Sequence, residues 1–190
     1  DANLEEVLLA LKSLDSVEAV ALGGSRSTGA SDENSDYDIY VYCAEIPTAE
    51  TRENLLGKYC SIAEFGNHYW ESEDNTVMSN GIPVDIIYRE VDRFGRYIDT
   101  VIKGGKAFNG YTTAFWHNIK NSKVLFDKTG TFTKFRDMAQ IDFPENLRSA
   151  IIKNNRNLLN GKLPSYDRQI KKTQELSLIH ISEPTRRVVI

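Results

Sequence analysis

Two short polar segments contain the residues whose types and spacing could carry out chemistry. The first, Gly-Gly-Ser-Arg at residues 23–26, follows an apolar run at 20–22. This arrangement predicts a buried strand that ends in a turn which only small residues allow, with a short helix starting at Ser25. Because such a turn presents backbone N–H groups, it can hold a phosphate.

The second segment contributes two carboxylates, Asp36 and Asp38, within a run rich in aromatic and β-branched residues. A strand turns the side chains at i and i+2 to the same face, so both carboxylates are expected to reach one cation. The sequence therefore predicts a metal site beside a phosphate site.

A third carboxylate, Asp85, is the only charge in the apolar run at 82–88, which follows a turn signal at Gly81. An acid inside a buried strand is costly unless it is paired or binds a metal ion. If this strand lies beside the one that carries Asp36 and Asp38, three oxygen ligands meet. Such a ligand set suits Mg²⁺ together with a triphosphate.

The order Gly-Gly-Ser, Asp-x-Asp and a later strand Asp resembles the nucleotidyltransferase superfamily, which includes DNA polymerase β and the kanamycin and lincosamide nucleotidyltransferases. Residues 110–118 and 124–127 further resemble a bacterial branch of small nucleotidyltransferases. The resemblance covers residues 1–160, with its catalytic core at 20–90. It implies an α/β (α+β) fold: a mixed-sheet palm flanked by helices and followed by a helical domain.

The resemblance also implies a reaction, in which a nucleoside monophosphate moves to a hydroxyl group and pyrophosphate is released. The donor would be ATP or another nucleoside triphosphate, with two Mg²⁺ ions as cofactors. The residues implied are Asp36, Asp38 and Asp85 as catalytic metal ligands, and Gly24, Ser25 and Arg26 as contacts of the donor. The acceptor stays open between a small molecule, such as an aminoglycoside or lincosamide, and a protein. The proton acceptor is expected to be Asp85 or a carboxylate from helices beyond residue 175, since in related antibiotic-modifying enzymes the base often lies outside the signature.

A second interpretation belongs to another functional class. Small members of this superfamily pair with helical toxin proteins, so the chain could be an antitoxin-like partner that acts by complex formation or by AMPylating the toxin. Some members act only as binding modules after losing a carboxylate. All three acids are present in this sequence, which favours the enzyme.

Composition limits the range of partners and locations. The 190 residues carry a formal net charge of −4, and 41% are hydrophobic, which is ordinary for a globular domain. The acidic total argues against nucleic acid as the main partner. No apolar run is long enough for a membrane span and no leader is evident, so a cytoplasmic protein is expected. Cys43 and Cys60 have neither a metal-binding spacing nor a disulfide pattern, which predicts small buried side chains.

Hydrophobic periodicity predicts the order of the elements. Strands are expected at residues 17–22, 36–43, 82–88 and 124–126, and helices at 3–14, 48–59, 91–102, 112–120, 131–139 and 145–160. Thr48 is expected to cap the second of these helices. Between residues 61 and 79 the pattern is ambiguous, and Asn75 is a candidate for a hairpin turn.

We divide the chain into a catalytic palm at residues 1–130, the start of a helical domain at 131–175 and a tail at 176–190. Residues 176–187 match the translation of a common transposase-based sequencing adapter in one reading frame, so the tail is predicted to be non-native. The natural chain is then expected to continue beyond Glu175 into helices that close over the acceptor.

Two further groups of residues have competing interpretations. His117 follows Phe115 and Trp116 on an apolar helix, so we expect it to be a packing residue rather than a ligand. The acids at 71, 73 and 74 form either a rim that attracts a cationic acceptor or a solvated turn.

Overall fold

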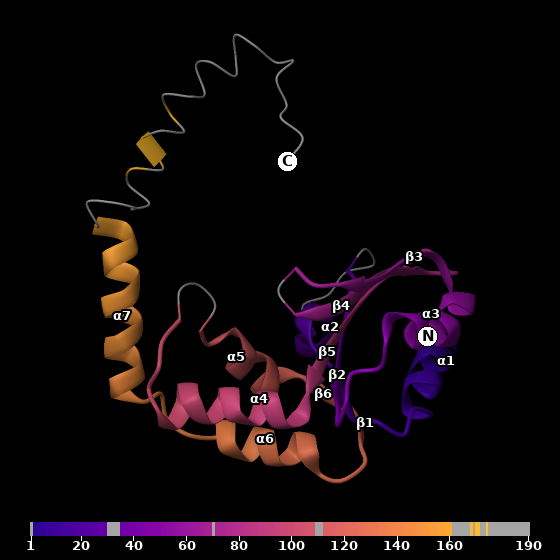
Figure 1. Cartoon of the computed structure of the whole chain (residues 1–190), viewed down its shortest axis with the longest axis horizontal. Helices are drawn as coiled ribbons and strands as arrows, with labels where there is room; N and C mark the ends of the chain where they lie inside the picture. The colour runs from indigo at the N-terminus through magenta and orange to yellow at the C-terminus, as the bar shows by residue number, and fades with distance from the viewer. Residues whose placement is uncertain are drawn as a thin grey trace.

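A mixed sheet of six strands lies at the centre of the part of the chain that the structure describes (Figure 1). This computed structural model describes residues 2–29, 35–69, 71–108 and 112–160, with residues 168, 170, 171 and 174 beyond them. The strands are β1 (Val17–Leu22), β2 (Tyr37–Cys43), β3 (Cys60–Asn67), β4 (Ser72–Met78), β5 (Pro83–Glu90) and β6 (Lys123–Asp127), in the spatial order β3-β4-β5-β2-β1-β6.

Helices cover both faces of this sheet. They are α1 (Ala2–Lys12), α2 (Gly24–Thr28), α3 (Ala49–Leu56), α4 (Val91–Ile98), α5 (Ala114–Asn121), α6 (Thr131–Ala139) and α7 (Glu145–Asn160), with a 3₁₀ turn η1 (Gly57–Tyr59) after α3 and a π-helical turn η2 (Asp99–Lys103) after α4. None of the described helices is long and apolar enough to cross a membrane. The α/β class predicted from the sequence is confirmed.

The strand pairing determines where the acidic residues lie. β2 and β5 are parallel and in register, so Asp38 pairs with Asp85. The neighbouring pairs β1–β2, β4–β5, β3–β4 and β1–β6 are antiparallel. Because alternate residues of a strand face opposite sides, Asp38 and Asp85 project from the same face of the sheet.

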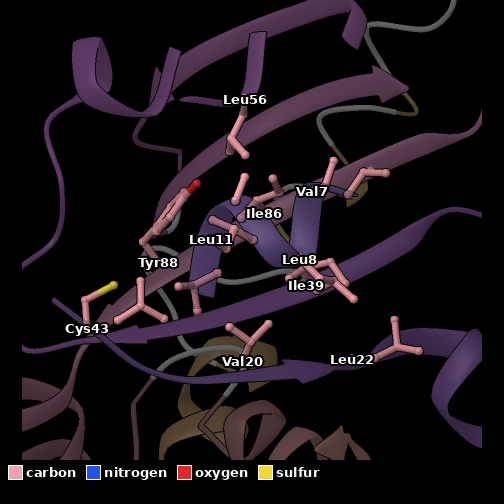
Figure 2. Packing of buried hydrophobic residues seen from close by; sticks show 14 of the residues in the cluster. Val7, Leu8, Leu11, Val20, Leu22, Ile39, Cys43, Leu56, Ile86 and Tyr88 are labelled. Atoms are coloured by element: carbon pink, nitrogen blue, oxygen red, sulfur yellow. The ribbon is translucent and has the colours of Figure 1, made fainter. Parts of the chain in front are cut away.

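One hydrophobic core lies between the sheet and the helices α1 and α3 (Figure 2). The apolar residues of α1 recur at helical spacing, and Val7, Leu8 and Leu11 are buried against the sheet. Figure 2 shows Ile39 of β2 and Ile86 of β5 beside these α1 side chains. Their strand neighbours Asp38 and Asp85 consequently face the opposite side.

A second, aromatic core lies on that opposite face, under α4, α5 and α6 (Figure 1). The ring of Tyr42 from β2 lies 5.4 Å from that of Phe94 and 5.4 Å from that of Phe132, measured between centroids. The indole Nε1 of Trp116 donates to the carbonyl oxygen of Ala139 at 2.8 Å, which ties α5 to the end of α6. These helices cover the sheet beside the acidic residues without covering the residues themselves, which are exposed or half-buried.

α7 follows Pro144 and extends beyond α4 and α6, away from the sheet (Figure 1). Its first turn joins the second core through the buried Leu147, and Asn154 Nδ2 donates to the carbonyl oxygen of Ala107 at 3.1 Å. The division at residue 130 stays a prediction, and the predicted non-native tail lies outside the described residues.

Most of the predicted elements are confirmed. The helices at 131–139 and 145–160 have the predicted bounds, and Thr48 Oγ1 caps α3 by accepting from the N–H of Thr51 at 3.2 Å. The hairpin turn at Asn75 was wrong, because Asn75 lies within β4, opposite Asp85. Cys43 is buried as expected, whereas Cys60 is only half-buried, and both cysteines are free.

Candidate active site

The turn between β1 and α2 requires glycine for two reasons. Gly24 has a φ of +61°, a left-handed conformation that other residues rarely adopt. A Cβ atom at this position would also overlap Oδ2 of Asp38. The preceding residue, Gly23, donates its N–H to the carbonyl oxygen of Asp38 at 2.8 Å. The glycine turn and the Asp38 carboxylate are therefore in direct contact.

The structure brings the three predicted carboxylates together. Asp36, Asp38 and Asp85 each offer an oxygen atom, and these atoms all lie within 4.8 Å of one another. Asp36 lies just before β2 and is exposed, whereas Asp38 and Asp85 are half-buried. A cluster of carboxylate oxygens is the ligand set that a hard divalent cation such as Mg²⁺ prefers.

Asp38 has a pKa above its ordinary value. Burial is the largest cause, and the negative charges of Asp36 and Asp85 raise the pKa further. A bound cation would oppose both effects, because it attracts the charged form of the carboxylate. The electrostatics of the cluster thus favour a positive ligand.

A chain of amides orients Asp85, and this chain could not be recognised from the sequence. Asn75 Nδ2 donates to Asp85 Oδ1 at 2.9 Å, and Asn67 Nδ2 donates to Asn75 Oδ1 at 2.7 Å. The bonds link β3, β4 and β5 across one face of the sheet. Their only signal in the sequence is polar residues at alternate positions in a segment whose pairing was unknown.

Arg26 of α2 is hydrogen-bonded to the backbone just before β2. Its Nε donates to the carbonyl oxygens of Ser35 at 2.8 Å and of Asp36 at 3.0 Å, and its Nη2 also donates to Ser35. The guanidinium stacks on the ring of Tyr37 at 4.2 Å from the centroid. These contacts hold the backbone that presents Asp36, and a contact of Arg26 with the donor stays a prediction.

A pocket of about 230 Å³ opens beside the glycine turn. It is lined by Gly23, Gly24, Ser25, Ser27, His117, Asn118, Asn121 and Ser122. The pocket therefore has one wall from the predicted signature and another from α5. Gly24 and Ser25 lie where a donor would have to bind if the sequence prediction holds.

The expectation that His117 packs in the core was wrong. Phe115 and Trp116 of α5 are buried, at 5% exposure each, but His117 lies on the exposed side of the helix and lines the pocket. One helical residue advances the side chain by about 100°, so apolar neighbours in sequence do not place a residue in the core.

Buried polar contacts hold the residues that line the pocket in place. Tyr40 of β2 accepts a hydrogen bond from Asn118 Nδ2 at 2.9 Å, and its ring fills the space next to Gly23. The buried guanidinium of Arg89 stacks on that ring at 4.4 Å from the centroid and binds Glu71 through Nη2 at 2.8 Å. Burial raises the pKa of Tyr40 to about 12, so its hydroxyl stays protonated.

The acids at 71, 73 and 74 do not form one rim. Glu71 pairs with Arg89, and Asp74 is fully buried on the other face of the sheet, where it pairs with Arg52 at 3.1 Å. Glu73 faces the side of Asp85, and its pKa is raised by partial burial and by the charges of Asp85 and Glu71. Of the three, only Glu73 lies on the side of Asp85 without an ion pair to another described residue.

Comparison with known families identifies the class of this protein. The family model of the nucleotidyltransferase domain matches residues 4–108, which is more than half of the chain. The chain belongs to this family, and it is a nucleotidyltransferase. A nucleoside triphosphate and a divalent metal ion are the general requirements of that class, and the carboxylate cluster fits the second of them.

Solved structures of other proteins are similar to this chain at low identity. A toxin–antitoxin complex with AMP-PNP is 14% identical and has a TM-score of 0.42, over 94% of this chain and 95% of that one. A cytoplasmic RNA terminal U-transferase is 20% identical and has a TM-score of 0.40, over 62% of this chain and 35% of that one. This chain thus spans about a third of the length of the U-transferase. No curated protein matched the sequence.

Proposed function

We propose that this nucleotidyltransferase moves a nucleoside monophosphate, AMP from ATP, to a hydroxyl group of a small molecule or a protein and releases pyrophosphate. The observation that carries the proposal is the meeting of Asp36, Asp38 and Asp85 within 4.8 Å, in contact with the Gly24 turn. A site for divalent cations and a site for phosphates are then adjacent. Nucleotidyl transfer needs both.

The three carboxylates would hold two Mg²⁺ ions, with Asp36 and Asp38 shared between them and Asp85 binding the second. When bound, the ions neutralise charge on the triphosphate and lower the pKa of the acceptor hydroxyl. Asn75 holds Asp85 in place by a hydrogen bond of 2.9 Å. Gly24, Ser25 and Arg26 would hold the donor on the other side.

The proposed step is an in-line displacement. The acceptor oxygen forms a bond to the α-phosphorus while the bond from that phosphorus to the pyrophosphate oxygen breaks, and pyrophosphate leaves with the electron pair. The acceptor proton goes to Asp85 or to another carboxylate. Glu73 is one such carboxylate, because it lies on the face of the sheet that carries Asp85, and partial burial and the charges of Asp85 and Glu71 raise its pKa.

The charge of the chain bears on the acceptor and the location. A formal net charge of −4 suits a neutral or cationic acceptor better than a long polyanion, so nucleic acid is not proposed as the substrate. Two free cysteines and a triphosphate donor fit a cytoplasmic enzyme.

Transfer of label from α-labelled ATP tests the proposal. The acceptors would be aminoglycosides, lincosamides and candidate helical partner proteins, each with and without Mg²⁺. We expect Mg²⁺-dependent transfer to one of them, and Asp38→Asn should lower its rate by about two orders of magnitude or more, the scale of losing a key electrostatic stabiliser. Asp92→Asn, which removes an exposed charge from α4, is the matched control.

The same assay separates the enzyme from the antitoxin-like alternative. A helical protein that is retained in a pull-down but never labelled would favour complex formation. A helical protein that is labelled would identify it as the acceptor. Equal labelling by the unaltered chain and Asp38→Asn would contradict the proposed site.

A further inference from the structure

α5 presents two polar side chains to the pocket beside the glycine turn. His117 and Asn121 are separated by one helical turn, so they share a face of the helix, and both are exposed. The opposite face of α5 is held by Phe115, Trp116 and Ile119 in the aromatic core. The packing of α5 in the core therefore fixes the positions from which His117 and Asn121 reach the pocket.

The contacts of Asn121 determine which nitrogen of His117 carries the proton. Asn121 Nδ2 lies 2.8 Å from the carbonyl oxygen of His117 and 3.2 Å from its Nδ1. The carbonyl oxygen can only accept, so the amide atom must be the nitrogen, which can only donate. Nδ1 of neutral His117 is then an acceptor, and the proton lies on Nε2. Within the described part of the chain no acceptor faces this Nε2–H, so His117 can donate it to an occupant of the pocket.

The two ends of the site differ in charge. The carboxylate cluster attracts cations, but the eight residues that line the pocket are glycine, serine, asparagine and histidine, with no acid among them. Gly24 lines the pocket and also touches Asp38, so the pocket begins where the cluster ends. A ligand with a metal-bound end and an anionic end of its own would fit both parts.

The other pocket residues of α5 are used to hold it in place. Asn118 Nδ2 donates to the Tyr40 hydroxyl at 2.9 Å, and the Ser122 hydroxyl donates to the carbonyl oxygen of Asn118. The ring of Tyr40 lies against Gly23. Because Tyr40 contacts both Asn118 and Gly23, it fixes the distance between α5 and the glycine turn. A pocket that binds a ligand from two sides needs such a fixed distance.

We propose that His117 and Asn121 bind the terminal phosphates of the donor triphosphate, opposite the glycine turn. The proposal rests on the proposed function and extends it to residues outside the part matched by the family model, residues 4–108. His117 donates from Nε2 to a phosphate oxygen, and Asn121 holds the ring in the tautomer that can do so. The leaving pyrophosphate then stays bound on the α5 side while the α-phosphorus is attacked beside Asp38.

Calorimetric titration of single variants tests this assignment, in the presence of Mg²⁺. The probes are a non-hydrolysable ATP analogue, inorganic tripolyphosphate and AMP. His117→Ala should weaken the binding of the analogue and of tripolyphosphate roughly tenfold, the scale of one hydrogen bond to a charged group. Asn121→Ala should weaken the binding of both probes roughly threefold. AMP, which has no terminal phosphates, should bind all variants within about twofold of the unaltered chain, a difference below that of a single hydrogen bond.

Two further variants serve as controls. His117→Gln keeps an N–H donor and should recover most of the lost affinity, whereas a purely structural role for the ring would give no such recovery. His68→Ala removes another exposed histidine that does not line the pocket, and it should bind every probe as the unaltered chain does. Melting temperatures should be equal throughout, because both histidines are exposed.

The outcomes separate this inference from the proposed function. If the unaltered chain binds the ATP analogue and His117→Ala binds it equally well, the inference is wrong and the proposed function stands. If His117→Ala weakens the binding of AMP as much as the binding of the analogue, the His117 side chain does not bind terminal phosphates. Failure of the unaltered chain to bind the analogue would overturn the proposed function and this inference together.

Discussion

Asp38 occupies a position in which its own charge is unfavourable. It is half-buried beside two other carboxylates, and burial and like charges both raise its pKa. The Gly24 turn packs against it in a conformation that excludes a side chain. Functional sites often hold residues in an arrangement that lowers the stability of the ligand-free protein. The loss of stability is compensated when the ligand binds.

This cost predicts how stability depends on pH in the metal-free protein. The folded-state pKa of Asp38 lies above its ordinary value of 3.8, so between the two values the folded state holds a proton that the unfolded state has released. The free energy of unfolding should therefore fall as pH rises through this window. Asp38→Asn has no such proton, and its free energy of unfolding should exceed that of the unaltered chain at neutral pH.

Urea unfolding of both proteins at a series of pH values, with a metal chelator present, measures this difference. The higher free energy of unfolding of Asp38→Asn should vanish below the ordinary pKa of aspartate, where Asp38 is protonated in both the folded and the unfolded state. An Asp38→Asn protein that is less stable than the unaltered chain at neutral pH would show that Asp38 is a structural residue.

At the level of elements, a buried ion pair joins α3 to the sheet on the side away from the site. Arg52 of α3 and Asp74 of β4 lie 3.1 Å apart, with 2% and 0% of their side chains exposed. The backbone N–H of Gly66 donates to Asp74 at 2.8 Å, and Arg52 stacks on the ring of Tyr88. Removal of one partner would leave a buried charge without its counter-ion.

We expect Arg52→Ala to lower the free energy of unfolding by about 3–5 kcal/mol, the usual cost of breaking a buried pair. The double variant Arg52→Ala with Asp74→Ala should lose less than the sum of the two single variants, because the stranded charge is gone. Chemical unfolding of the four proteins checks this prediction. Additive losses would mean that the two side chains are not coupled.

The elements themselves were largely predictable from the sequence. Apolar periodicity and caps located α6 and α7 at their observed bounds. The metal site was predicted on the condition that the strands with Asp38 and Asp85 lie side by side, and these strands do pair. The prediction of a turn at Asn75 was wrong. The partner of Asn75 lies on another strand, so the neighbouring residues in the sequence do not indicate that this polar residue belongs to a strand. The position of His117 depended on helix rotation, and the pairing of Arg52 depended on which strand lies under α3.

At the level of the whole molecule, the candidate site combines distant parts of the chain. The cluster and the glycine turn come from residues 23–85, whereas His117 and Asn121 follow after α4 and η2. The sequence signature located the first group because its spacing is local. It could not locate the second, because only the packing of α5 on the sheet brings these residues near Gly24.

The tail at residues 176–190 is predicted to be non-native from its sequence, so it should contribute nothing to the fold. Deletion of these residues should leave the melting temperature unchanged, because they lack an apolar period that could pack on a helix or sheet. Thermal unfolding of the full and shortened chains measures the effect. A fall of several degrees on deletion would mean that the tail is packed and native.

The central claim is that three carboxylates form one metal-dependent nucleotide site. Its most direct test is calorimetric binding of a non-hydrolysable ATP analogue, with and without Mg²⁺, to the unaltered chain, Asp38→Asn and Asp85→Asn. Asp92→Asn controls for the loss of one negative charge. We predict that Mg²⁺ strengthens binding to the unaltered chain and to Asp92→Asn, and that this strengthening falls at least about tenfold in the other two variants, since each lacks a charged metal ligand. Equal Mg²⁺-dependent binding by all four proteins would contradict the claim.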